Sequence, residues 1–551
     1  MTRDKIAILS GIMLGMLLAA LDQTIVATAM PRIVEEFNAL SHLSWVFTAY
    51  MLASAITVPI YGKLSDIFGR RGLYLIGIII FLVGSVLSGL SQSMLQLILF
   101  RGVQGIGAGA IMVNSFAVIA DVFPVRERGK WQGLLGAMFG VASVAGPLLG
   151  GFITDNFSWR WIFYINIPLG FLAMVVLWYG LPKIVHEVKD RTIDYWGAIL
   201  MTSTLLPLLL ALVWGGSEYA WGSSEIIALI GWSIGSLCLF LSQEMRSSNP
   251  ILSLALFKDR IFSVSMISVF LTAMGMFGAI LYIPVFAQGV IGVSGTGAGL
   301  ALTPLMLGIV FASTITGHLI SKTGRYKRNA VIGVTLIVIG MFSFVTITTE
   351  TGSLALALRM IVLGLGLGCT FPVFNIAVQN AFGPERVGEV TASVQLARNV
   401  GGTVGTAILG GVMNAQLTKH LAEIGSDPFV RGMSAIDPTN PIADVNVDSI
   451  QGLLNPVVQD SIRDSLVQAP GSEALISLFN AFVESLKVAF TSSVVQVFVV
   501  ATVLMVVGWI VVMFLPEKPL RTSHKDEGLL EKAGRELEEE FGSDSPQSFA
   551  H

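Results

Sequence analysis

Long apolar segments recur from one end of this sequence to the other. A helix needs about 20 predominantly apolar residues to cross the hydrocarbon core of a bilayer, and fourteen segments meet that need. They lie at residues 6–30, 44–62, 73–92, 96–120, 131–153, 161–181, 195–214, 224–243, 262–287, 297–319, 330–349, 354–378, 393–413 and 491–515. Only 13% of the 551 residues are charged, about half the share of a soluble protein. The sequence therefore predicts an all-α integral membrane protein and excludes a soluble enzyme or a disordered chain.

The basic residues orient these segments. Cytoplasmic loops carry an excess of Lys and Arg, and a cytoplasmic N-terminus places most of the 33 Lys and Arg on that side. Three fall inside spans (Arg101, Arg359 and Arg398), and the loops on the outer side hold Arg32, Arg160, Lys419, Arg431, Arg463 and Lys487. Omitting one span would invert half of the loops. We therefore expect fourteen transmembrane helices with both termini in the cytoplasm. The run at 6–30 is too long for a signal peptide and is expected to be the first span.

Two short patterns occur twice. Gly62–Arg71 (GKLSDIFGRR) between spans two and three resembles Gly317–Tyr326 (GHLISKTGRY) between spans ten and eleven, and Arg101 and Arg359 each precede alternate glycines in spans four and twelve. Two parallel halves with a substrate site between them are a transporter architecture. The repeat predicts a six-helix bundle at 1–182, a linker with two extra helices at 183–260, a second six-helix bundle at 261–515 and a cytoplasmic tail at 516–551.

Asp22 is the only carboxylate that the sequence places firmly inside a span. A charge at the centre of a membrane helix costs at least about 2.5–3.5 kcal/mol, so it needs a function or a partner. Either Asp22 is a proton or cation site, because removal from water favours the protonated carboxyl, or it is the structural partner of an arginine. Asp22 and Arg101 lie roughly 10 and 8 Å from the outer ends of their helices, so a contact is feasible. The alternative is that Arg101 extends to the outer interface.

Small residues and charges mark two further places. Span five contains Gly136, Gly140, Gly146, Pro147, Gly150 and Gly151. Small residues four apart let helices approach closely, and a proline bends a helix, so this span is either a sliding surface or a statically packed one. The loop between spans two and three contains Gly62, Asp66, Gly69, Arg70 and Arg71. Its charges either lock one conformation or only set the topology.

Other classes of site have no support in the sequence. We find no phosphate-binding loop, zinc-ligand set or nucleophile triad, and both cysteines lie in apolar runs. The net charge of −3 gives no basic field for nucleic acid. We therefore expect no enzyme activity, no metal, no cofactor and no nucleic-acid partner.

The segment 414–490 is too long for a simple connection. Part of it has apolar residues at helical spacing, which predicts an amphipathic helix: Leu475, Leu478, Phe479, Phe482 and Leu486. It is either a lid or partner surface, or an ordered insertion that packs on the helix ends.

Several motifs together resemble one family. They are Leu21–Pro31 (LDQTIVATAMP), Gly62–Arg71, Arg101–Gly107 (RGVQGIG), the glycines from Gly140 to Gly151, and Trp159–Pro168 (WRWIFYINIP). This combination resembles the major facilitator superfamily, and within it the fourteen-helix drug:proton antiporters. The motifs cover the N-terminal half densely, and topology covers the rest.

The resemblance implies proton-driven export of amphipathic drugs by alternating access. It implies Asp22 as the protonation site, Arg101 as its coupled partner, protons as the coupling ion, a monomer as the functional unit and the plasma (inner) membrane as the location. Two departures matter. The second copy of the loop has Tyr326 where the first copy has Arg71. Span ten lacks the acidic residue that some relatives that handle divalent cations carry there. The second departure favours neutral or monocationic substrates.

The substrate pocket and the cargo are less constrained. Residues near mid-span that could line a pocket are Asn114, Phe116, Tyr282, Phe286, Phe374 and Asn375. Aromatic side chains could hold a cation, but they equally serve packing. Two alternatives to drug export stay open: export of an endogenous lipid or metabolite on the same fold, and a membrane sensor or scaffold that acts through 414–490 or the tail.

Overall fold

The computed structural model describes residues 3–37, 43–182, 192–216, 218–293, 301–424, 428–430, 453–454, 456–467 and 472–520. These residues form helices joined by short connections, with one isolated β-bridge between Gly215 and Tyr219. Most of the predicted tail, from residue 521 onward, lies outside the described residues, as does most of 425–471.

The described residues of the first half form nine helices. Their bounds are α1 Arg3–Phe37, α2 Leu43–Phe68, α3 Arg70–Gly89, α4 Met94–Val122, α5 Val125–Asn156, α6 Trp161–Tyr164, α7 Asn166–Gly180, α8 Tyr195–Trp214 and α9 Ser224–Arg246. In this half α4 packs on α2 and α3, and α1 packs on α5 and α7. The pair α8–α9 forms a hairpin that leans on α2. We call α1–α7 the N-terminal bundle.

The second half repeats this arrangement. Its helices are η2 Leu254–Lys258, α10 Arg260–Phe286, η3 Ala287–Ile291, α12 Thr303–Thr323, α13 Lys327–Phe344, α14 Ser353–Ala381, η4 Pro384–Arg386, α15 Val387–Ile424, α18 Pro456–Val467 and α19 Ser472–Met513. Here α14 packs on α12 and α13, and α10 packs on α15 and α19. We call α10–α19 the C-terminal bundle.

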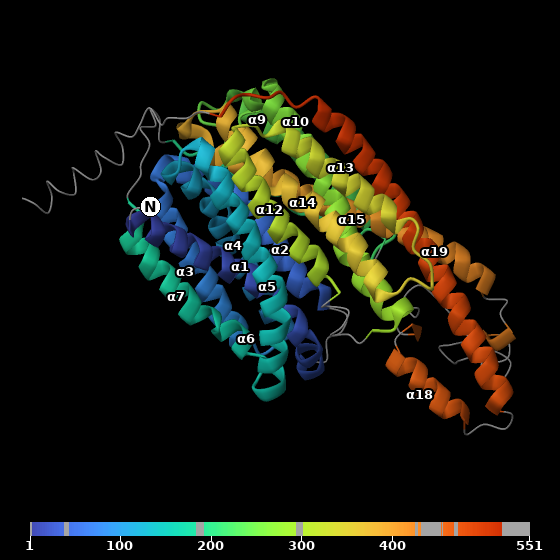
Figure 1. The fold of residues 1–551 in the computed structure, drawn as a ribbon. Coiled ribbons are helices and arrows are strands. Elements are labelled where there is room, and N and C mark those ends of the chain that lie inside the picture. Colours follow the sequence, from blue (N-terminus) through green and yellow to red (C-terminus); the bar gives the residue numbers. More distant parts are fainter. Residues whose placement is uncertain are drawn as a thin grey trace, which may run out of the picture.

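The two bundles meet along two helix pairs. Helix α5 lies beside α12, and α2 lies beside α15 (Figure 1). We call the end where α2 and α12 finish and α5 and α15 begin the basic end, because Lys63, Arg71, Lys322 and Arg325 gather there. The residues that join the bundles lie between this end and the middle of α5, as described below.

Thirteen helices of the described part are long and apolar enough to cross a membrane. The predicted span at 393–413 is not among them, although it lies within the 38-residue helix α15. Helix α15 buries polar side chains such as Thr391, Ser393 and Gln395 against its neighbours, and these lower its hydropathy. With α15, the helices account for the fourteen predicted spans, and the chain is a multi-pass membrane protein.

The structure corrects several predicted boundaries. The expected loop at 62–71 is mostly helical: α2 continues to Phe68, and only Gly69 interrupts the chain before α3. Gly69 has φ 89°, and Gly324 in the second copy has φ 69°, a conformation that favours glycine. The predicted amphipathic helix of the outer segment is the beginning of α19 itself, where Phe479, Phe482 and Leu486 are buried in the C-terminal core.

Candidate functional site

A buried ion pair lies in the middle of the N-terminal bundle. Arg101 on α4 donates from Nη1 to Asp22 Oδ2 on α1 at 2.5 Å, and both side chains are buried. Gln104 Nε2 and Asn166 Nδ2 donate to the other carboxylate oxygen at 2.8 and 2.9 Å. Three donors on two oxygens is the arrangement of an ionised carboxylate. The contact that the matching depths allow is therefore formed, and Arg101 does not extend to the interface.

A second layer of residues fixes the donors. Asn166 also donates to Ser85 Oγ at 3.0 Å, and Ser85 donates to the carbonyl of Phe163 at 2.8 Å. The guanidinium of Arg101 lies 4.2 Å from the ring centroid of Tyr50 on α2. Helices α1, α2, α3, α4 and α7 thus all contribute to one buried polar network, so a change of charge at Asp22 would affect each of them.

Helix α5 contacts this site through two glycines. A Cβ atom on Gly146 or Gly150 would collide with the hydroxyl oxygens of Thr24 and Thr28 on α1. Thr24 donates to the Ala142 carbonyl of α5 at 2.9 Å. Because Thr24 lies two residues from Asp22, the half of α5 that lies away from the basic end packs directly beside the ion pair.

The other half of α5 packs across the bundle interface. Gly133 lies against the backbone of Ser313 on α12, whose hydroxyl donates to the Gly133 carbonyl at 3.1 Å. Further along, a Cβ atom on Gly140 would collide with Val310. Helix α5 therefore contacts α12 from the basic end to Gly140 and contacts α1 beyond it, so it connects the interface to the ion pair.

A carboxylate joins the bundles at the basic end. Asp66 near the end of α2 accepts hydrogen bonds from the backbone nitrogens of Gly388 and Glu389, both at 2.9 Å, at the start of α15. Arg70 pairs with Asp66 and with Asp121, the latter at 2.8 Å. A carboxylate at a helix N-terminus is favoured by the helix dipole. Arg71 instead lies 4.8 Å from the Trp178 ring of α7, away from the interface.

The second helix pair, α5 and α12, is joined by a positive charge instead of a negative one. Arg126 at the start of α5 donates to the carbonyls of Ser321 and Lys322 at the end of α12, at 2.9 and 3.1 Å. Gly129 and Gly317 bring the two backbones into contact nearby. Both pairs of helices are therefore closed at the basic end.

The sequence matches the model of the Major Facilitator Superfamily over residues 12–406. The chain belongs to the Major Facilitator Superfamily. Its relatives include the "multidrug transporter protein MdtP" of Bacillus subtilis, 36% identical over 96% of this chain and 97% of that protein. "Multidrug resistance protein 3" of the same organism is 35% identical over 93% of this chain and 95% of its own length.

A solved structure of the superfamily has the same fold. The proton:xylose symporter XylE superposes with a TM-score of 0.58 at 17% identity, over 95% of this chain and 98% of that one. The family resemblance and the all-helical membrane fold inferred from the sequence are thus confirmed.

The second bundle of this superfamily member has no counterpart of the ion pair among the described residues. Arg359 matches Arg101 in the repeat, but it donates to the Ser343 carbonyl at 2.9 Å and to the Thr346 hydroxyl at 3.3 Å. Arg398, which the sequence places near the end of its span, lies eleven residues into α15 because this helix begins at Val387. Its guanidinium is 4.0 Å from the centroid of the Phe371 ring.

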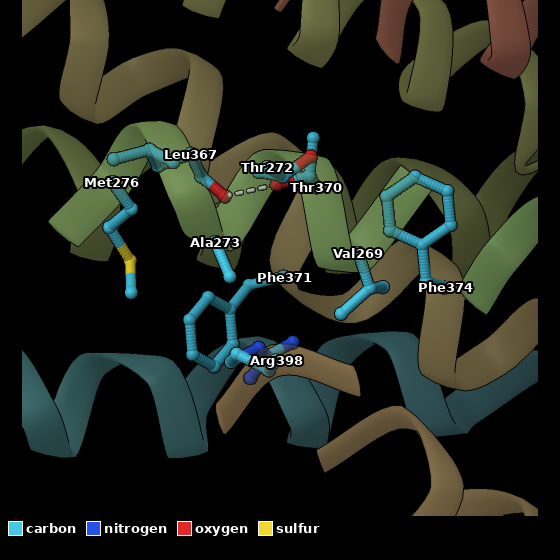
Figure 2. A pocket seen from close by; sticks show the side chains of 9 residues that line it. All are labelled: Val269, Thr272, Ala273, Met276, Leu367, Thr370, Phe371, Phe374 and Arg398. Carbon is cyan, nitrogen blue, oxygen red and sulfur yellow. Dashed lines mark hydrogen bonds between the residues drawn. The ribbon is translucent and has the colours of Figure 1, made fainter. Parts of the chain in front are cut away.

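The predicted pocket residues do not gather at one place. Phe116 is in the core of the N-terminal bundle, and Tyr282 and Phe286 are in the core of the C-terminal bundle. Phe374 lines a small cavity with Arg398 (Figure 2). The side-chain oxygens of Asn114 and Asn375 are buried and accept no hydrogen bond from the described residues.

Sequence reasoning missed several members of the site. Gln104 and Asn166 lie inside the quoted motifs at Arg101–Gly107 and Trp159–Pro168, so the motifs contained them without revealing their roles. Gly388 and Arg126 carry no sequence signal for a contact, because each contact joins a side chain to a backbone group of a distant helix: Asp66 to the Gly388 nitrogen, and Arg126 to the Ser321 carbonyl. In the part of the chain that the structure describes, no group of three or more His, Cys, Asp or Glu could hold a metal.

Proposed function

We propose that this protein is a proton-coupled antiporter that exports amphipathic small molecules by alternating access. The observation that carries the proposal is the buried carboxylate of Asp22, which is held by Arg101, Gln104 and Asn166 at membrane depth. The multidrug transporters among its relatives support the cargo class. Protons are the coupling ion, and the chain acts as a monomer in the plasma (inner) membrane with both termini in the cytoplasm.

Protonation would change the hydrogen bonds that Asp22 can form. A neutral carboxyl carries a donor and loses the charge that attracts Arg101. Its hydroxyl would face groups that are themselves donors, so the network would have to rearrange. Because Thr24 and Gly146 join α1 to α5 beside this site, the rearrangement would be felt along α5 and at its interface with α12.

The conformation of the bundles fits one stage of such a cycle. With the basic end in the cytoplasm, the contacts of Asp66 and Arg126 close the cytoplasmic side. We infer an outward-facing state, in which Asp22 has released its proton or awaits one from outside. The glycines of α5, the hinge glycine Gly69 and the close approach of Gly62 to Gly388 would allow the bundles to reorient.

The test is transport of ethidium in proteoliposomes under an imposed pH gradient. The wild-type protein should drive ethidium against its concentration gradient. Asp22→Asn should reduce the ethidium flux that depends on the pH gradient by at least about tenfold. Glu36→Gln is the matched control, since Glu36 is a carboxylate of the same helix beyond the span at Lys5–Met30. Gradient-driven flux that survives in Asp22→Asn would overturn the assignment of the proton site.

A further inference from the structure

The cavity in the C-terminal bundle has one charged residue in an otherwise apolar and hydroxyl-bearing lining. Its walls come from α10, α14 and α15 (Figure 2): Val269, Thr272, Ala273 and Met276; Leu367, Thr370, Phe371 and Phe374; and Arg398. The cavity is small, about 20 Å³, where a single water needs about 10–15 Å³. It therefore has room for a small polar group but not for a whole drug in this conformation.

Arg398 is the unusual member of this lining. It lies about 16 Å along α15 from Val387, so its charge is well removed from the basic end. Its contacts are the Phe371 ring at 4.0 Å and the side-chain oxygen of Gln395 at 3.4 Å. No carboxylate of the described residues lies within 4.0 Å of it, in contrast to Arg101, which Asp22 neutralises.

A purely structural role accounts poorly for this placement. Stacking on one ring and a long hydrogen bond to an amide leave most of the five guanidinium donors without a partner among the described residues. An arginine stays charged under all physiological conditions. The cavity therefore has a permanent positive charge whose natural complement is an anion from outside the protein.

The cavity also lies where the two bundles meet. Phe371 packs against the apolar core of the N-terminal bundle, and a Cβ atom on Gly136 of α5 would lie 3.9 Å from its ring. The position between the bundles is where transporters of this architecture bind their substrates. An occupant of the cavity would thus contact the helices that move.

We propose that Arg398 binds the anionic headgroup of amphipathic carboxylates or sulfonates. The planar guanidinium offers two parallel donors to such a group, while Phe371, Phe374 and Met276 offer an aromatic and adaptable apolar surface for the rest of the molecule. This inference rests on the proposed export function and names its substrate class. It adds an anionic class to the neutral and monocationic substrates that the absence of an acid in span ten favours.

The test compares two nearly isosteric ligands, 1-naphthaleneacetate and its neutral amide, 1-naphthaleneacetamide. Binding to purified full-length protein is measured at pH 7 by isothermal titration calorimetry. The wild type should bind the anion at least about tenfold more tightly than the amide, as expected for a charge-assisted hydrogen bond. Arg398→Gln should bind both ligands with the affinity of the amide, and Arg359→Gln, the matched control from the same bundle, should keep the wild-type preference.

A second variant tests the site with Arg398 in place. Thr370→Asp puts a carboxylate on the wall of the cavity, where it would neutralise Arg398, and it should abolish the preference for the anion without loss of amide binding. A preference that persists in Arg398→Gln or Thr370→Asp, or its absence from the wild type, would overturn the inference. Gradient-driven ethidium transport is measured separately, so the antiport function can stand while the headgroup site falls.

Discussion

The two bundles repeat the same helix order, but their matching arginines have different partners. In the N-terminal bundle, Arg101 is buried and paired with Asp22 at 2.5 Å. At the matching place in the C-terminal bundle, Arg359 is half-buried, and its partners among the described residues are a carbonyl and a hydroxyl. In the described residues, one bundle therefore pairs its arginine with a carboxylate, whereas the matching arginine of the other bundle has no acidic partner. A repeat of topology is thus not a repeat of chemistry.

The same contrast appears where the bundles join. Asp66 places a buried negative charge at the N-terminus of α15, and Arg126 places an exposed positive charge at the C-terminal carbonyls of α12. Each charge complements its helix dipole. The two contacts differ in exposure, and exposed charges contribute little because solvent screens them. The α2–α15 contact should therefore be the stronger of the two.

The largest expected effect tests the contrast between the arginines. Arg101→Gln removes one partner of a buried ion pair and leaves Asp22 uncompensated, which destabilises a protein by about 3–5 kcal/mol. Arg359→Gln removes partly exposed hydrogen bonds and should cost less than about 1.5 kcal/mol. Unfolding in mixed detergent micelles, followed by circular dichroism, measures both.

The double variant Asp22→Asn/Arg101→Gln sharpens this comparison. It leaves no uncompensated charge, so it should recover part of the stability lost in Arg101→Gln. Equal destabilisation by Arg101→Gln and Arg359→Gln would show that the charge at Asp22 is not decisive.

The next effect concerns the two contacts at the basic end. Asp66→Asn weakens two charge-assisted hydrogen bonds, each worth about 1.5–3 kcal/mol, and should increase the population that is open at this end about tenfold or more. Arg126→Gln should change it less than about fivefold. Spin labels at Phe68→Cys and Arg386→Cys, both exposed positions, report the opening by electron–electron distance measurement. An equal shift in the two variants would show that burial does not separate these contacts.

Much of this molecule could be predicted from its sequence, for identifiable reasons. Membrane helices can be predicted because each is a local apolar run. The depths of Asp22 and Arg101 follow from counting residues along two helices. The depth of Arg398 does not follow in the same way. The predicted span begins at residue 393, six residues after the start of α15 at Val387, because the first turns of this helix are polar. The contacts of Asp66 and Arg126 involve backbone groups of distant helices, so no side-chain pattern marks them.

A smaller effect separates contacts within a bundle from contacts between bundles. A methyl group added at Gly146 would overlap Thr24, and one added at Gly140 would overlap Val310. Each overpacking change should cost about 1–3 kcal/mol. Because Gly146 lies inside the N-terminal bundle, Gly146→Ala should lower its stability, whereas Gly140→Ala should mainly increase opening between the labelled sites.

Gly151→Ala is the matched control, because a Cβ atom at this position of α5 meets open space. It should leave stability within about 0.5 kcal/mol of the wild type and the label distances unchanged. If Gly151→Ala behaves like Gly146→Ala, the effect comes from α5 in general and not from its contact with α1.

The smallest effect compares the bundles at the end opposite the basic end. There, Glu36 accepts hydrogen bonds from Arg160 at 2.8 Å and from Trp159 at 2.6 Å, and these contacts hold the pKa of Glu36 below its usual value. The C-terminal bundle instead uses the rings of Phe429, Phe479 and Phe482, which carry no titrating proton. The stability from Glu36 is present above its unfolded-state pKa and is lost as the pH falls through the folded-state pKa. The Glu36 side chain is 43% exposed, so the loss should stay below about 1 kcal/mol.

Hydrogen exchange, corrected for intrinsic rates, measures this effect. Acid should increase exchange at the end of α1 but not at the start of α19, and Glu36→Gln should remove that difference. An equal increase at both ends would contradict the prediction.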